Sequence, residues 1–160
     1  MLRKEILAAP PMTSAGRATA KDIARIATVL VTSEDADYPI DHVFDGSRGR
    51  GASRWIAEKP GEQTVILAFD MPQTIGKVIV EVEETDISRT QEMDVSISGD
   101  GGHTYRELLR QEYTFSPPGT TFEHEEWSVT AEAVSHFRLR IKPDKGAKVC
   151  RATLTALLLE

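Results

Sequence analysis

Apolar and polar residues alternate along several short segments of this chain, with the period of two that is typical of half-buried β-strands. The alternation is clearest in KVIVEVEE (77–84), MDVSIS (93–98) and HFRLRIK (136–142). The 3.6-residue period of a helix does not persist beyond a turn or two. Each of these segments is therefore predicted to be a strand with one face toward a core.

Other segments extend this pattern to about eight strands, separated by turns rich in Gly, Pro, Asp and Ser. The further candidates are IATVLVTS (26–33), QTVILAFD (63–70), TYRELLRQEY (104–113), EEWSVTA (125–131) and RATLTALLL (151–159). Short strands at this spacing are typical of two packed antiparallel sheets. We predict an all-β chain that folds as a two-sheet antiparallel β-sandwich.

The division of the chain into parts follows from composition. Residues 1–20 are rich in Ala, Pro, Thr and Ser, have no sustained period, and are predicted to form a flexible N-terminal arm. Residues 21–160 show no repeat and no linker, and are predicted to form one binding domain.

Charge and cysteine content limit the classes of partner. The net charge of −6 argues against a protein that coats nucleic acid, because that task requires many Lys and Arg residues on phosphates. A single cysteine, Cys150, favours a reducing compartment. No segment has the roughly 18 apolar residues of a membrane span, and the start MLRKEILAAPPM is too short for a secretory signal. We expect a cytoplasmic location and no membrane span.

Four segments, in this order, resemble the galactose-binding-domain-like superfamily, which includes discoidin and coagulation factor type C domains and many carbohydrate-binding modules. They are PIDHVFDGSRGRGASRW (39–55), GEQTVILAFDMPQTIGKVIVEV (61–82), MDVSISGDGGHTYREL (93–108) and HFRLRIKP (136–143). The resemblance covers roughly residues 26–159. It implies a jelly-roll sandwich that binds a ligand without catalysis.

Part of the same region, SRWIAEKPGEQTVILAFDMPQTIGKVIVEV (53–82), is also similar to the N-terminal domain of single-strand-break repair scaffold proteins. That similarity implies binding of a protein partner, or of nicked DNA. The basic row that would serve this alternative consists of Arg138, Arg140 and Lys142, which alternate with apolar residues and share one strand face. The other interpretation of the same row is a solvated strand face that is paired with glutamates on neighbouring strands.

The segment HVFDGSRGRGASRW (42–55) is the strongest candidate for a ligand-binding loop. It is not a phosphate-binding P-loop, because no Gly-Lys-Ser/Thr follows. In one interpretation, the ligand is bound at the end of the sandwich by Arg48, Arg50, Arg54 and Trp55. The guanidinium groups would then bond to hydroxyls, carboxylates or phosphates of the ligand. The other is an Asp-Gly turn with solvated arginines and a Trp in the core.

Metal and catalytic chemistry receive little support. The resemblance implies that Asp45 can hold a structural calcium ion, but Arg48 and Arg50 would repel a cation there. We therefore expect no cofactor, with calcium at Asp45 left as an alternative. The four histidines lack metal-ligand spacing, and FEHEEW (122–127) has no helix to gather its side chains.

No nucleophile motif occurs in the sequence, so we predict a protein that is not an enzyme. The function predicted is recognition of a carbohydrate or similar polar ligand by loops at one end of the sandwich. The alternative is a protein–protein or DNA-repair scaffold that uses the basic face.

Overall fold

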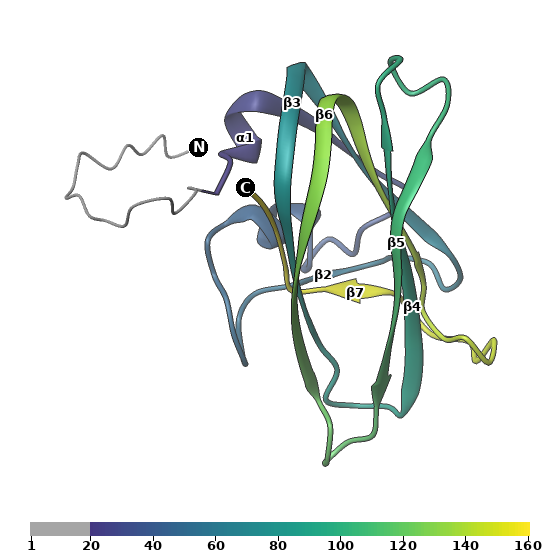
Figure 1. Cartoon of the computed structure of the whole chain (residues 1–160). Helices are drawn as coiled ribbons and strands as arrows, with labels where there is room; N and C mark the ends of the chain where they lie inside the picture. The colour runs from purple at the N-terminus through teal and green to yellow at the C-terminus, as the bar shows by residue number, and fades with distance from the viewer. Residues whose placement is uncertain (1–19) are drawn as a thin grey trace.

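The computed structural model describes residues 20–160, so nearly all of the predicted arm lies outside the described residues. Two short helical elements and eight strands follow in chain order (Figure 1). They are α1 (Ile23–Ile26), β1 (Ala27–Val31), the 3₁₀ helix η2 (Ile40–Phe44), β2 (Trp55–Ile56), β3 (Gln63–Glu83), β4 (Arg89–Ser98), β5 (Arg106–Phe115), β6 (Phe122–Lys142), β7 (Thr153–Leu154) and β8 (Ala156–Leu159). No helix among residues 20–160 is long and apolar enough to cross a membrane.

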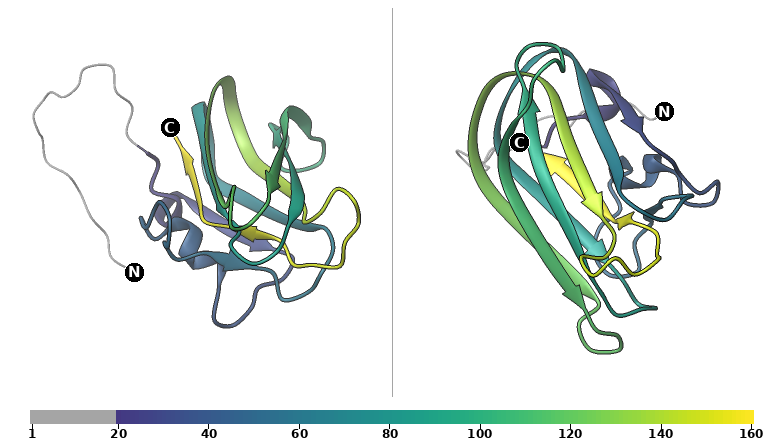
Figure 2. Two further views of the ribbon diagram at one scale, coloured as in Figure 1. Left: turned by 90° about the horizontal axis from the view of Figure 1, so that it is seen from below. Right: turned by 90° about the vertical axis from the view of Figure 1, so that its right-hand side faces the viewer.

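The two long strands β3 and β6 run antiparallel to each other and take part in both layers of the sandwich. One layer contains β1, the first half of β3, the second half of β6, β4 and β5. The other contains β8, the second half of β3 and the first half of β6. Figure 2 shows both strands arching over one end of the molecule. The predicted two-sheet antiparallel sandwich is confirmed.

The bend in these strands explains why the sequence predicts shorter segments. The register of β3 against β6 shifts between Ala68 and Lys77, where bulges let one strand turn from one layer into the next. Ala133, with φ of 54°, lies at the corresponding bend of β6. The segments predicted as separate strands are therefore halves of two continuous ones.

Residues of the predicted inward faces form the core. On β3, Val78, Val80 and Val82 are almost completely buried, and on β6 so are Phe137 and Leu139. Each large apolar side chain removed from water contributes about 1.5–3 kcal/mol to stability. The structure thus confirms the strand faces that the alternation in the sequence predicts to pack inward.

One side of the sandwich is left open. In the described part of the chain, β5 pairs only with β4, and the first half of β6 pairs only with β3. Figure 1 shows this side, with β7 visible between β5 and β6. We call the region between these two unpaired strand edges the open side.

Candidate functional site

The loop 45–54 is held against the sheet by two buried carboxylates. Glu81 and Glu83 alternate with the inward-facing valines of β3 and therefore point out of the sandwich, yet the loop covers them both. The backbone N–H of Gly49 donates to Glu81 at 2.8 Å, and that of Gly51 donates to Glu83 at 2.9 Å. Both glycines have positive φ, at which a side chain would be strained.

The three loop arginines diverge instead of forming one binding lip. Arg48 donates to Glu81 at 3.1 Å, and Arg54 donates to Glu83 at 2.7 Å. Arg50 donates to Thr121 at 2.9 Å, and its guanidinium carbon lies 5.3 Å from the ring centroid of Phe122. The arginines that were predicted to contact a ligand thus mainly contact acidic and aromatic side chains of the protein itself.

Ion pairing also tunes the carboxylate under this loop. Burial alone would raise the pKa of Glu81, but hydrogen bonds from Gly49, His124 and Arg48 together lower it. The carboxylate therefore stays ionised and keeps the loop attached at neutral pH.

Trp55 belongs to the core. Its side chain is 0% exposed, and the indole Nε1–H donates to the carbonyl oxygen of Ser33 at 3.0 Å. The interpretation that this ring stacks on a ligand is therefore wrong for this structure, and the alternative of a core Trp is correct. The indole instead fixes the start of β2 and with it the end of the loop.

A pocket of about 380 Å³ opens beside the end of this loop. It collects side chains from the segments before β2 and after β3. The lining residues are Tyr38, His42, Ala52, Ser53, Arg54, Ile56, Thr85 and Asp86. Of the loop arginines, Arg54 alone lines this pocket, while Arg48 lines a separate one of about 170 Å³. We call the larger one the loop-end pocket.

The polar groups of the loop-end pocket have defined hydrogen-bonding roles. His42 Nδ1 donates to the carbonyl oxygen of Arg54 at 2.8 Å, so in the neutral ring Nε2 is an acceptor. The Arg54 guanidinium is held by Glu83 but remains 22% exposed, so it can still donate to a ligand. Tyr38 is 40% exposed and offers an aromatic surface. The pocket therefore combines donor, acceptor and apolar contacts.

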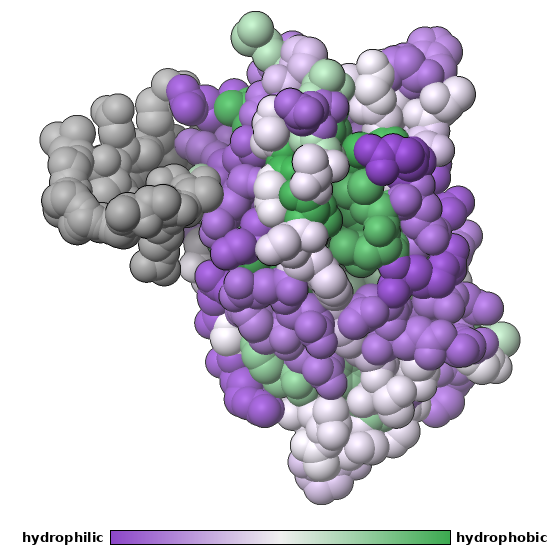
Figure 3. Space-filling view, in the orientation of Figure 1, coloured by the Kyte–Doolittle hydropathy of each residue, from purple (hydrophilic) through white to green (hydrophobic). Residues whose placement is uncertain are grey.

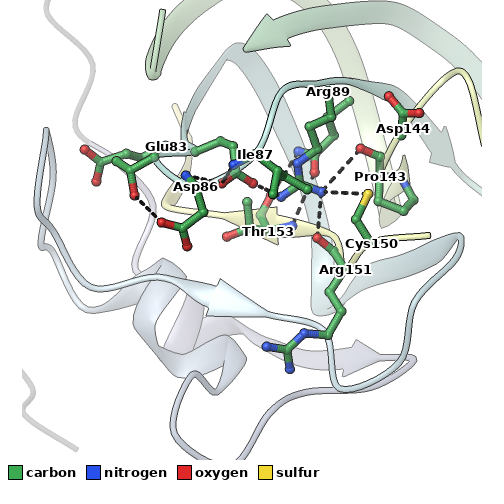
Figure 4. A network of polar contacts seen from close by, with 12 residues as sticks. Glu83, Asp86, Ile87, Arg89, Pro143, Asp144, Cys150, Arg151 and Thr153 are labelled. Carbon is green, nitrogen blue, oxygen red and sulfur yellow. Dashed lines mark hydrogen bonds and ion pairs between the residues drawn. The ribbon is translucent and has the colours of Figure 1, made fainter. Parts of the chain in front are cut away.

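A buried ion pair braces the segment that carries Asp86 (Figure 4). The Glu84 carboxylate accepts the backbone N–H groups of Asp86 at 2.8 Å and of Ile87 at 3.2 Å, and it also pairs with Arg89. Arg89 in turn donates to the carbonyl oxygen of Arg151 at 2.6 Å. These contacts tie the segment after β3 to the chain before β7, so Asp86 is presented on a fixed backbone.

Sequence reasoning missed most of the loop-end pocket. Tyr38, Thr85 and Asp86 carry no motif, and His42 was considered only as a metal ligand. The one available signal was the position of Tyr38 and His42 on either side of the apolar turn that precedes Asp-Gly. The 43 residues of sequence between His42 and Asp86 give no sign that the two side chains line one pocket.

The predicted basic row is present but is neutralised in part. Arg140 donates to Asp94 on β4 at 3.0 Å, and the guanidinium of Arg138 lies 3.9 Å from the centroid of the Tyr105 ring. Lys142 is exposed and lies opposite Glu92. This arrangement matches the interpretation of a solvated face paired across strands. Binding of a protein or DNA there stays a prediction.

Calcium at Asp45 stays the alternative to the predicted absence of a cofactor. The Asp45 carboxylate accepts the backbone N–H of Ser47 at 2.8 Å and the hydroxyl of Ser53 at 2.6 Å. Within residues 20–160, no group of three or more His, Cys, Asp or Glu side chains is placed to hold a metal ion.

Comparison with known proteins bears on the fold. No protein-family model matches this sequence, and no curated protein matches it either. The structure is similar to the CBM32 module of AlyQ in complex with 4,5-unsaturated mannuronic acid, with 18% identity, a TM-score of 0.62 and coverage of 89% of this chain and 98% of that one. It is similar to the family 32 module of Clostridium perfringens NanJ in complex with galactose, with 14% identity, a TM-score of 0.60, and 88% and 97% covered.

A third similar structure is CBM32-3 from a family 31 glycoside hydrolase of Clostridium perfringens, with 12% identity, a TM-score of 0.65, and 88% and 93% covered. Such modules also occur within larger enzymes, as in truncated AlyQ with its alginate lyase domains. The similarity to repair scaffold proteins stays a prediction. The chain therefore has the same β-sandwich fold as these family 32 carbohydrate-binding modules.

Proposed function

We propose that this chain is a non-catalytic carbohydrate-binding module whose ligand occupies the loop-end pocket. The observation that carries the proposal is the meeting of Tyr38, His42, Arg54 and Asp86 around one cavity. A sugar presents an apolar C–H face and hydroxyl groups that both donate and accept hydrogen bonds. This set of side chains matches each of those features.

Each residue has a separate role in the proposal. The Tyr38 ring packs on the C–H face of a pyranose, His42 Nε2 accepts a hydroxyl proton, and the Arg54 guanidinium donates to a hydroxyl oxygen. Asp86, which also lines the pocket, accepts from further hydroxyl groups. A volume of about 380 Å³ lies at the lower end of the range for small-ligand sites and favours a short saccharide.

Two further observations support a binding role without catalysis. The solved structures of similar fold include modules in complex with mannuronic acid and with galactose. The lining of the loop-end pocket contains one carboxylate, Asp86, whereas hydrolysis of a glycosidic bond normally requires two that flank the bond.

A saccharide panel tests this function by thermal shift and isothermal calorimetry. A ligand at ten times its Kd adds about 1.4 kcal/mol to stability and raises Tm by roughly 3–5 °C in a domain of this size. We expect Tyr38→Ala and Arg54→Met to weaken binding about tenfold or more. The control Arg106→Met, an exposed arginine on β5 remote from the pocket lining, keeps wild-type affinity. A panel without any shift, or wild-type affinity in both pocket variants, overturns the proposal.

A further inference from the structure

The open side has a lining that the loop-end pocket does not explain. Its walls are the unpaired edges of β5 and of the first half of β6. In an antiparallel pair, residues directly opposite each other point to the same face of the sheet. Glu123, Glu125 and Trp127 of β6 lie opposite three valines of β3 that are fully or almost fully buried. These valines are Val82, Val80 and Val78.

Two carboxylates therefore occupy inward-facing positions of β6, where alternation would normally place apolar side chains. Both are partly exposed, and within residues 20–160 neither Glu123 nor Glu125 forms a hydrogen bond or ion pair through its side chain. The buried acids Glu81, Glu83, Glu84 and Asp94 are each paired with an arginine. An inward-facing carboxylate without a cation loses part of its hydration, and this favours the binding of a complementary group.

Tyr113 supplies independent evidence for a missing ligand. It lies on the inward face of β5, opposite the buried Gln91, and is 3% exposed. Its hydroxyl is buried and has no hydrogen-bond partner among the described residues. Burial raises the pKa of this hydroxyl, and the negative charges of Glu125 and Glu123 raise it further, so these carboxylates lie close enough to act on it electrostatically. A buried hydroxyl left unpaired costs stability unless something binds it.

We propose that the open side is a second binding site, which takes an amino sugar whose ring carries a protonated primary amine. The ammonium group pairs with Glu123 and Glu125, which stand about 7 Å apart along the strand. The partly exposed Trp127 packs on the ring face and attracts the cation through its π system. The Tyr113 hydroxyl bonds a sugar hydroxyl. Figure 3 shows apolar residues at the surface between β5 and β6, which suit the C–H face of a pyranose.

A hydroxylated ligand fits this lining better than a lysine-rich peptide does. A lysine ammonium group would satisfy the carboxylates but offers no acceptor for the Tyr113 hydroxyl. The inner face of β5 also carries Gln111, whose amide both donates and accepts, as hydroxyl groups require. The site is separate from the loop-end pocket, since the two share no lining residue.

Tryptophan fluorescence gives a direct measurement, because the chain has two tryptophans and Trp55 is fully buried. The titration compares a glucosamine trisaccharide with its N-acetylated counterpart, which keeps the ring and hydroxyls but lacks the charge. It is done at low ionic strength and about pH 6, where such an amine is protonated. We expect the glucosamine trisaccharide to change the emission of Trp127 and to bind at least tenfold more tightly than the acetylated form. Added salt weakens this binding.

Matched variants locate the site. Glu123→Gln with Glu125→Gln removes the charge at nearly constant shape and is expected to weaken glucosamine binding roughly tenfold or more. The control Glu62→Gln makes the same kind of charge change at an exposed residue just before β3 and leaves binding unchanged. Equal binding of the two trisaccharides overturns the proposal, as does retained binding in the double variant. Binding of a polylysine peptide without binding of glucosamine also overturns it.

Discussion

Replacing Glu83 by glutamine tests how the loop 45–54 delivers Arg54 to the loop-end pocket. The carboxylate accepts the Gly51 N–H at 2.9 Å and the Arg54 guanidinium at 2.7 Å, and its side chain is only 6% exposed. Glutamine has nearly the same shape but can satisfy the guanidinium with a neutral oxygen only. The substitution therefore removes charge from the pair without opening a cavity.

The loss of stability expected in Glu83→Gln lies between two limits. Breaking a fully buried pair costs about 3–5 kcal/mol, whereas a solvent-exposed pair contributes about 0–1 kcal/mol. Arg54 is 22% exposed and also donates to the Glu83 carbonyl oxygen at 3.3 Å, so it recovers some hydration and keeps one contact. We expect Glu83→Gln to lower the free energy of unfolding by about 2 kcal/mol. With a urea m-value of about 2 kcal/mol/M, the midpoint falls by about 1 M.

A double-mutant cycle with Arg54→Met separates the pair from its surroundings. We expect a coupling free energy of about 1–2 kcal/mol between Glu83 and Arg54, measured by urea unfolding. Saccharide affinity should fall roughly five- to tenfold in Glu83→Gln, since Arg54 loses its fixed direction. The exposed Glu58→Gln is the control. A change below about 0.5 kcal/mol in Glu83→Gln, or a coupling near zero, refutes this account of the loop.

Three further outcomes are expected. The pKa of His124 is raised from 6.5, first by its hydrogen bond to Glu81 and then by that to Glu126. The protonated ring therefore stabilises the fold below pH 6.5, and this contribution is lost as pH rises through the raised pKa. The urea midpoints of wild type and of His124→Gln should therefore converge at high pH. A difference between the two midpoints that stays constant with pH contradicts this account. Trp55→Ala should cost about 3–5 kcal/mol and Trp55→Phe less, in the same assay; a loss below about 1 kcal/mol in Trp55→Ala contradicts a core role. Millimolar calcium should move Tm by no more than about 1 °C relative to chelator, because neighbouring serines already donate to Asp45; a rise of several degrees would reveal a calcium site.

The sequence alone determined where most strands lie and which faces they bury. In segments such as 77–84 and 136–142, alternation is a local property, since successive side chains of a strand point to opposite faces. The core positions Val80 and Leu139 could therefore be assigned without knowing any partner strand. The sandwich class followed from the same pattern, together with the spacing of the turns.

Tertiary structure decided which polar groups meet. Arg54 binds Glu83 across 29 residues of sequence, and His42 shares a pocket with Asp86, but neither pair leaves a local pattern. The glutamates of FEHEEW gave no sign that two of them face inward, because their direction depends on the register of β6 against β3. Local periodicity specifies a strand's faces, whereas the contacts of a charged side chain depend on how distant segments pack, and that packing created both proposed binding sites.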